Sequence, residues 1–153
     1  MPADRPPLPL AEGPRDSGAR AQKYRVEGRA SPIDGYGAFV MEPIPARRKI
    51  GEIRGEAISV KEARRRARGA ARIMIVEISD RRAIDASNSS DPLRFANHSC
   101  EPNAALRIRQ GRIEIFSRRD LPAGIELTLD YGETHHAGTL PCRCGSKTCV
   151  GWL

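Results

Sequence analysis

The chain has 153 residues, which is enough for one domain with its own core and too few for two. It carries 26 lysine and arginine residues against 19 acidic ones; the formal net charge of +7 favours acidic partners such as nucleic acid, although a solvated basic surface is the more ordinary explanation. No segment has the run of ~18 apolar residues that a membrane span needs, and none has the pattern of a signal peptide, so we expect no membrane association and a cytoplasmic protein with reduced thiols.

The first half of the chain predicts short strands and one helix. Residues 1–22 are rich in proline, arginine and glycine, and we expect them to be disordered. Strands bounded by glycine and proline are predicted in 24–29, 37–44 and 50–58. Residues 59–72 predict a helix, because Ser59 can cap it and Glu62 follows at the spacing of a capping box. We expect it on the surface, with nucleic-acid contact through its arginines as the alternative.

The second half continues the β pattern. Residues 72–79 are apolar enough for a buried strand, and residues 104–117 alternate apolar and polar on both sides of Gln110-Gly111, which predicts a hairpin. A G-x-G-x-x-G fingerprint after a strand is missing, which excludes a Rossmann domain. We therefore expect a mainly β domain.

Three of the four cysteines stand at the end of the chain with the spacing C-x-C-x4-C, namely Cys142, Cys144 and Cys149. The fourth, Cys100, lies forty-two residues before Cys142. Two disulfides are the alternative, but a reducing compartment disfavours them and cysteines two positions apart bridge only with strain. Four thiolates suit a tetrahedral zinc ion, which would attach the tail to the segment around Cys100 and contribute to folding.

Cys100 belongs to one of five segments that together resemble the motifs of SET-domain protein lysine methyltransferases with a post-SET zinc tail. In chain order these are "SPIDGYGAF" (31–39), "AIDAS" (83–87), "RFANHSCEPNA" (94–104), "ELTLDYGE" (126–133) and "LPCRCGSKTCVGWL" (140–153). The resemblance implies a SET-domain β-clip of several small curved sheets with a C-terminal pseudoknot. It divides the folded chain into a SET domain at 23–135 and a zinc tail at 136–153.

The resemblance also implies an activity, the transfer of a methyl group from S-adenosylmethionine to a lysine of a protein or peptide. Tyr131 matches the catalytic tyrosine, which orients the amine; a desolvated channel keeps that amine neutral. Gly35 and Gly37 would let the backbone approach the cofactor. Trp152 would cover the adenine, with plain core packing as its alternative. The implied cofactor-binding residues are Gly35, Tyr36, Gly37, Arg94, Phe95, Asn97, His98, Tyr131 and Trp152.

The implied lysine channel contains Met74, Leu129 and Tyr131. Met74 stands where many relatives have a second pocket tyrosine, so either Tyr36 compensates or the channel is less polar. Leu129 occupies the position that governs the number of methyl groups added, and its room favours multiple methylation. Met74 also motivates an alternative from another class, a catalytically silent SET module that binds a peptide or chromatin.

The sequence motifs do not identify the substrate protein. The basic residues comprise 22 arginines and 4 lysines, which indicates a bacterial source. The target would then be a bacterial protein, or a histone if the enzyme is delivered to a host nucleus. A monomer and a homodimer are both compatible with the sequence, and a zinc-stabilised nucleic-acid-binding protein is the third alternative.

Overall fold

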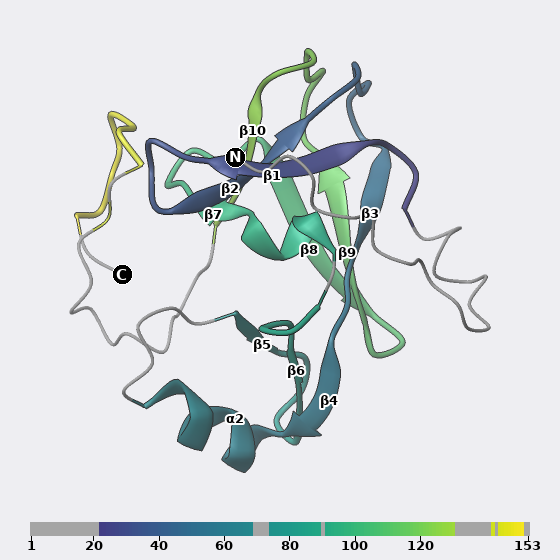
Figure 1. Ribbon diagram of the computed structural model, residues 1–153, viewed down its shortest axis with the longest axis vertical. Helices are drawn as coiled ribbons and strands as arrows, with labels where there is room; N and C mark the ends of the chain where they lie inside the picture. Colours follow the sequence, from purple (N-terminus) through teal and green to yellow (C-terminus); the bar gives the residue numbers. More distant parts are fainter. Residues whose placement is uncertain (1–21, 69–73, 90, 131–141, 143, 152–153) are drawn as a thin grey trace.

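The computed structural model describes residues 22–68, 74–89, 91–130, 142 and 144–151. This part of the chain holds ten strands, the helix α2 and the short 3-10 turn η1, so the mainly β fold is confirmed. Within these residues, no helix has the length and apolar character needed to cross a membrane. Three small sheets make up the β structure (Figure 1).

The first sheet has the strand order β1-β2-β10-β7. Its strands are β1 (Val26–Ala30), β2 (Tyr36–Val40), β10 (Glu126–Leu129) and β7 (Asn97–His98). All neighbours are antiparallel except β7, which runs parallel to β10. The second sheet consists of β3 (Lys49–Ile53), β9 (Arg112–Ser117) and β8 (Ala104–Arg109). The third consists of β4 (Glu56–Ser59), β6 (Arg82–Asp85) and β5 (Ile75–Glu77).

The hairpin predicted in 104–117 is confirmed as β8 and β9, which pair from Ala104↔Ser117 to Arg109↔Arg112. Its two turn residues, Gln110 and Gly111, both have positive φ, of 54° and 75°. Positive φ at both positions defines the type I′ turn, whose twist matches that of the flanking strands.

Two of the strand predictions were wrong in detail. Residues 50–58 form two strands in different sheets, because the chain breaks at Gly55, where a Cβ would lie 2.2 Å from the carbonyl oxygen of Asp85. The strand predicted as buried in 72–79 is β5, whose three residues are only half-buried. It lies at the edge of its sheet and is covered on fewer sides than a central strand.

The helix predicted in 59–72 exists but is shorter. It is α2 (Val60–Ala67), and the Ser59 hydroxyl accepts a hydrogen bond of 3.0 Å from the Glu62 N–H, as the capping prediction requires. Arg68 already has extended backbone, with ψ of 125°. Only Val60, Ala63 and Ala67 of the helix are buried, so its position on the surface is confirmed.

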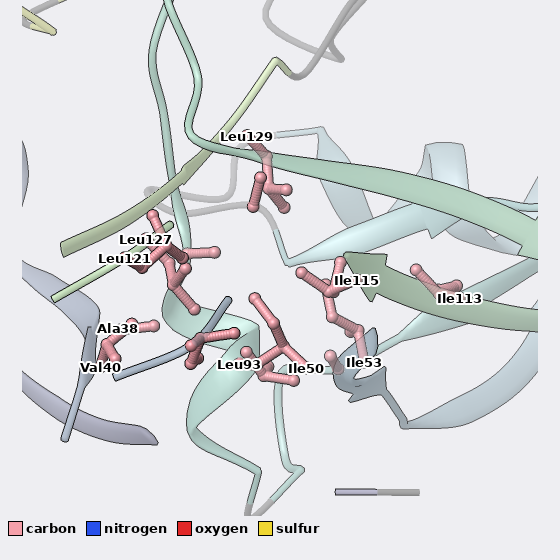
Figure 2. Close-up of a cluster of buried hydrophobic side chains, with 14 residues drawn as sticks. Ala38, Val40, Ile50, Ile53, Leu93, Ile113, Ile115, Leu121, Leu127 and Leu129 are labelled. Carbon is pink, nitrogen blue, oxygen red and sulfur yellow. The ribbon is translucent and has the colours of Figure 1, made fainter. Parts of the chain in front are cut away.

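The core joins the first two sheets through η1 (Pro92–Phe95). Figure 2 shows Leu93 of this turn among apolar side chains of the surrounding strands, including Val40, Ile50 and Ile115. These side chains are at most 2% exposed. Because η1 leads directly into β7, this packing also fixes the position of Asn97 and His98.

Candidate cofactor and zinc site

The parallel pairing of β7 with β10 brings together two of the motif segments. Asn97 stands opposite Thr128 and His98 opposite Leu129. The Ser99 N–H continues the ladder with a bond of 2.9 Å to the Leu129 carbonyl. The segment that the resemblance assigns to the cofactor therefore lies beside the strand that leads into Tyr131, which is itself outside the described residues. The C-terminal pseudoknot that the resemblance implies stays a prediction.

A polar cluster ties β7 to the turn before β2. The buried Asn97 Nδ2 lies 3.0 Å from the Tyr36 carbonyl oxygen and 3.1 Å from that of Asp34. It also lies 2.9 Å from a carboxylate oxygen of Glu126, which accepts a bond from the Ser31 hydroxyl at 2.8 Å. Since the Asn97 amide is engaged within the protein, what this residue offers to a cofactor is its main chain on the edge strand β7.

Gly35 and Gly37 are required for two different reasons. Gly35 has a φ of 43°, the left-handed region that glycine adopts at little cost. A Cβ at Gly37 would lie 2.1 Å from Glu126 Oε2 and 3.1 Å from the Ser31 Cβ. Glycine at 37 therefore makes room for a carboxylate of the protein, a role that the sequence analysis did not foresee.

Replacing Gly37 with alanine is expected to lower the free energy of unfolding by about 1–3 kcal/mol, because the Glu126 carboxylate must leave its partners. Urea unfolding measures the loss. The Glu126→Ala background serves as the control: there the same substitution should cost much less, as a double-mutant cycle would show. Equal costs in both backgrounds would contradict the assigned contact.

Tyr36, Phe95 and Arg94, which are also assigned to the cofactor, form an aromatic and cationic group beside the turn that precedes β2. The Tyr36 ring lies 5.5 Å from the Phe95 ring, and the Arg94 guanidinium lies 4.2 Å above the Phe95 ring. Arg94 Nη1 donates to the Ser87 carbonyl at 2.9 Å and contacts the Met74 sulfur at 3.2 Å. Met74, assigned to the lysine channel, thus touches a residue assigned to the cofactor.

These groups fit the chemistry of S-adenosylmethionine. Its adenine needs an apolar or aromatic face and main-chain hydrogen bonds, and its carboxylate needs a cation. The Tyr36 and Phe95 rings, the edge strand β7 and the Arg94 guanidinium supply these types of group. Leu129, assigned to the lysine channel, is only 3% exposed. Trp152 lies outside the described residues.

The four cysteines come together in space. The sulfur atoms of Cys100, Cys142, Cys144 and Cys149 all lie within 4.8 Å of one another. Those of Cys100 and Cys142 are 4.0 Å apart. Ligands at about 2.3 Å from a tetrahedral zinc ion would be roughly 3.8 Å apart, so the cluster fits this metal. All four are free thiols, so the structure does not contain the two disulfides that were the alternative.

The main chain around the cysteines favours thiolates. The N–H groups of Val150 and Gly151 point to the sulfurs of Cys100 and Cys149 at 3.3 Å. Burial raises the pKa of Cys142 to about 12. At Cys144 the N–H groups of Cys100 and Ser146 outweigh burial and lower the pKa to about 5. The N–H groups thus favour the thiolate at Cys144, whereas burial raises the pKa of Cys142 and of Cys100, so a divalent cation bound here would displace protons from the cluster.

His98 joins the two parts of the site. Its Nε2 lies 3.3 Å from the Cys100 sulfur, and its ring is 6% exposed. Burial lowers its pKa, against the opposing effect of Asp130, so the neutral ring is favoured. The cysteine cluster and the β7 main chain are therefore in direct contact through one side chain.

Asp91, which none of the sequence motifs indicated, holds the start of η1. Its carboxylate accepts a bond of 3.0 Å from the Leu93 N–H and another from the Gln22 amide. Burial raises the pKa of Asp91 to about 6. Serine, threonine, aspartate or asparagine directly before a proline is a known signal for the start of a helical turn, so "DPLRF" could have indicated this cap.

The raised pKa of Asp91 predicts how stability changes with pH. The folded state holds the proton more tightly than the unfolded chain, so this contribution is fully present below about pH 4 and is lost as the pH rises to about 6. Asp91→Asn keeps the cap without the buried charge, so at pH 7 it should be more stable than the wild type by about 1–3 kcal/mol.

Urea unfolding at a series of pH values checks this expectation, and the gain of Asp91→Asn should shrink towards pH 4. The exposed Asp80 provides the control, since Asp80→Asn removes the same formal charge without relieving a buried carboxylate and should not raise the stability at pH 7. A loss of stability in Asp91→Asn at pH 7 would show that the charged carboxylate is needed.

Comparison with known proteins agrees with the motifs and the site. The model of the SET domain family matches residues 35–132. The chain is 34% identical over 145 residues to "Histone-lysine N-methyltransferase ASHH1" of Arabidopsis thaliana, covering 88% of this chain and 28% of that protein. It is 35% and 33% identical to proteins named "Histone-lysine N-methyltransferase, H3 lysine-4 specific" from Kluyveromyces lactis and Schizosaccharomyces pombe.

These two fungal alignments cover 86% and 91% of this chain but only 14% and 16% of the fungal proteins. The chain thus spans less than a third of the length of the relatives it matches. The family match covers more than half of the chain, and it includes the glycine turn, the β7 segment and the strand leading into Tyr131. The chain belongs to the SET domain family.

Proposed function

We propose that the protein is an S-adenosylmethionine-dependent protein-lysine N-methyltransferase. The observation that carries this proposal is the parallel pairing of Asn97 and His98 with Thr128 and Leu129, which sets the cofactor segment beside the strand that precedes Tyr131. The names of the relatives, all histone-lysine methyltransferases, support the same class of substrate.

S-adenosylmethionine, when bound, supplies a methyl group activated by a cationic sulfur. The residues that would hold it are the main chain of β7 and of the Gly35–Gly37 turn, together with Arg94 and Phe95. Trp152 would cover the adenine. On the lysine side, the apolar side chains of Met74 and Leu129 would disfavour the ammonium form of the incoming amine. The Tyr131 hydroxyl would then orient the neutral amine by hydrogen bonding.

The four cysteines would hold a structural zinc ion. A site with four protein ligands leaves no open position for catalysis, so the role of the metal would be to fix the tail. The tail would then stay close to His98, whose ring touches the Cys100 sulfur. In this arrangement zinc contributes to the shape of the cofactor site without taking part in the chemistry.

The test combines calorimetry with the transfer of a labelled methyl group to a panel of histones and bacterial proteins. We expect one cofactor bound per chain and label on lysine side chains, which mass spectrometry would locate. A chain that gives no heat with S-adenosylmethionine would favour the silent module that Met74 motivates. No heat of binding would contradict the methyltransferase. The labelled lysines would also decide between a bacterial target in the cytoplasm and a host histone.

A further inference from the structure

Two loops at the same end of the molecule place four arginines side by side. The loop after β2 carries Arg47 and Arg48, and the loop after β9 carries Arg118 and Arg119; all four are exposed. The loops are joined by their main chains: the Arg47 N–H donates to the Ser117 carbonyl at 3.0 Å, and the Ser117 N–H donates to that of Arg48 at 2.9 Å. In Figure 1 the loop between β2 and β3 (blue) and the loop between β9 and β10 (light green) both lie at the top of the view.

None of these four loop arginines lies within 4.0 Å of a carboxylate of the described residues. The helix α2 differs in this respect. Arg64 is 3.0 Å from Glu77, and both Arg65 and Arg66 bond to Glu62. Arg64, Arg65 and Arg66 of the helix, which was considered for nucleic-acid contact, are thus paired with carboxylates, whereas the four loop arginines are not. The loop after β9 also carries the exposed Asp120, whose carboxylate accepts a hydrogen bond from the Ala46 N–H.

The outer face of the second sheet adds a smaller net positive charge, because three of its cations pair with two carboxylates that are hidden from solvent. Its two carboxylates, Glu52 and Glu114, are buried, with side chains 5% and 2% exposed. They lie beneath Lys49, Arg109 and Arg112, all within 3.1 Å of one or both. The guanidinium groups remain accessible, since the side chains of Arg109 and Arg112 are 68% and 48% exposed. Solvent therefore meets the cations of this face and not its acids.

The same face offers no apolar anchor among the described residues. Arg107 covers the Phe116 ring, with its guanidinium 4.6 Å from the ring centroid. The exposed large apolar side chains of the structure are Tyr36, Ile108 and Val150. Of these only Ile108 belongs to the sheet, and strand alternation directs it to the side opposite Arg107 and Arg109. Specific protein interfaces are centred on aromatic and apolar side chains, whereas a phosphate backbone requires cations.

We propose that this surface, which we call the basic face, binds the phosphate backbone of duplex DNA. The basic face comprises Arg47, Arg48, Arg118 and Arg119 of the loops and Lys49, Arg107, Arg109 and Arg112 of the sheet. The six residues of β8 span about 20 Å, the length of roughly six base pairs. The cysteine tail, yellow in Figure 1, lies on the other side of the molecule from β3, so DNA on the basic face leaves the tail accessible.

Fluorescence anisotropy with a labelled 20-base-pair duplex between 50 and 200 mM salt tests the proposal. The variant Arg118→Gln/Arg119→Gln should bind about tenfold more weakly, and the slope of log K against log salt should become less steep by roughly 2. The matched control, Arg64→Gln/Arg65→Gln, removes the same formal charge from α2 and should change affinity less than twofold. All four side chains are exposed, so thermal unfolding should confirm that both variants fold.

Two results would overturn the proposal. The helix variant could weaken binding as much as the loop variant, which would place the contact elsewhere. Alternatively, polyglutamate of equal charge could bind as tightly as the duplex, which would indicate an acidic protein surface as the partner. Methyl transfer to a short free peptide, measured in parallel, should be unchanged in both variants, so this test and that of the methyltransferase fail independently.

Discussion

Replacing Cys144 with serine is expected to lower zinc affinity at least about 100-fold and to destabilise the tail. Loss of a residue that only contacts a metal ligand already lowers metal affinity by about 10–100-fold, and this substitution removes a ligand itself. The described tail residues contain no strand, and the tail reaches Cys100 through its sulfurs and through N–H groups that point to them. Without the metal, we expect the tail to leave His98 and cofactor binding to weaken together with thermal stability.

Metal content per chain, the unfolding temperature and calorimetry with S-adenosylmethionine measure these three effects separately. Thr148→Ala is the matched control, because this exposed side chain lies in the same tail segment and its loss keeps all four thiols and their main-chain contacts. Chelation of the wild type should reproduce the effects, and added zinc should reverse them. A Cys144→Ser protein that retains zinc at full affinity would show that the cluster is not the metal site.

Replacing Tyr131 with phenylalanine is expected to slow methyl transfer by about 10²–10³-fold, the usual cost of one orienting hydrogen bond at a reacting centre. Cofactor affinity should change less than twofold, because the ring remains. Single-turnover transfer of labelled methyl to a lysine substrate measures the rate, and calorimetry measures the affinity.

Tyr36→Phe is the control for this experiment. Tyr36 is 47% exposed and its ring lies beside Phe95, so loss of its hydroxyl should leave the rate within about threefold. A large loss there would instead support the hypothesis that Tyr36 compensates for Met74. Transfer by Tyr131→Phe at the wild-type rate would refute the role assigned to Tyr131.

The features that could be predicted from the sequence depend on signals within a few residues. The Gln110-Gly111 turn and the Ser59 cap follow from turn geometry and cap spacing, and both of these are local. The thiol cluster is the exception: it joins Cys100 to the tail, and it could be predicted because the chain has only four cysteines. The resemblance supplied the order in which the distant segments meet. The match to the SET domain family agrees with that order.

The features that were missed depend on contacts between distant segments. The break at Gly55 arises from the carbonyl of Asp85, thirty residues later in the chain. The pairing of Arg64 depends on Glu77, which belongs to β5 of the neighbouring sheet and not to the helix. Composition gave the positive charge of the protein, but the pairing of side chains across strands decided which arginines remained available.

The approach of the Glu126 carboxylate to the Gly37 backbone bears on how related sequences can diverge. A side chain at position 37 has no space while the long acidic chain occupies its place. A lineage that loses the glycine must therefore shorten or redirect its partner at 126, and the two positions should covary. Such covariation would show that Gly37 is required by contact with another residue of the protein. A survey that attributes every glycine near a cofactor to ligand binding would therefore assign Gly37 the wrong role.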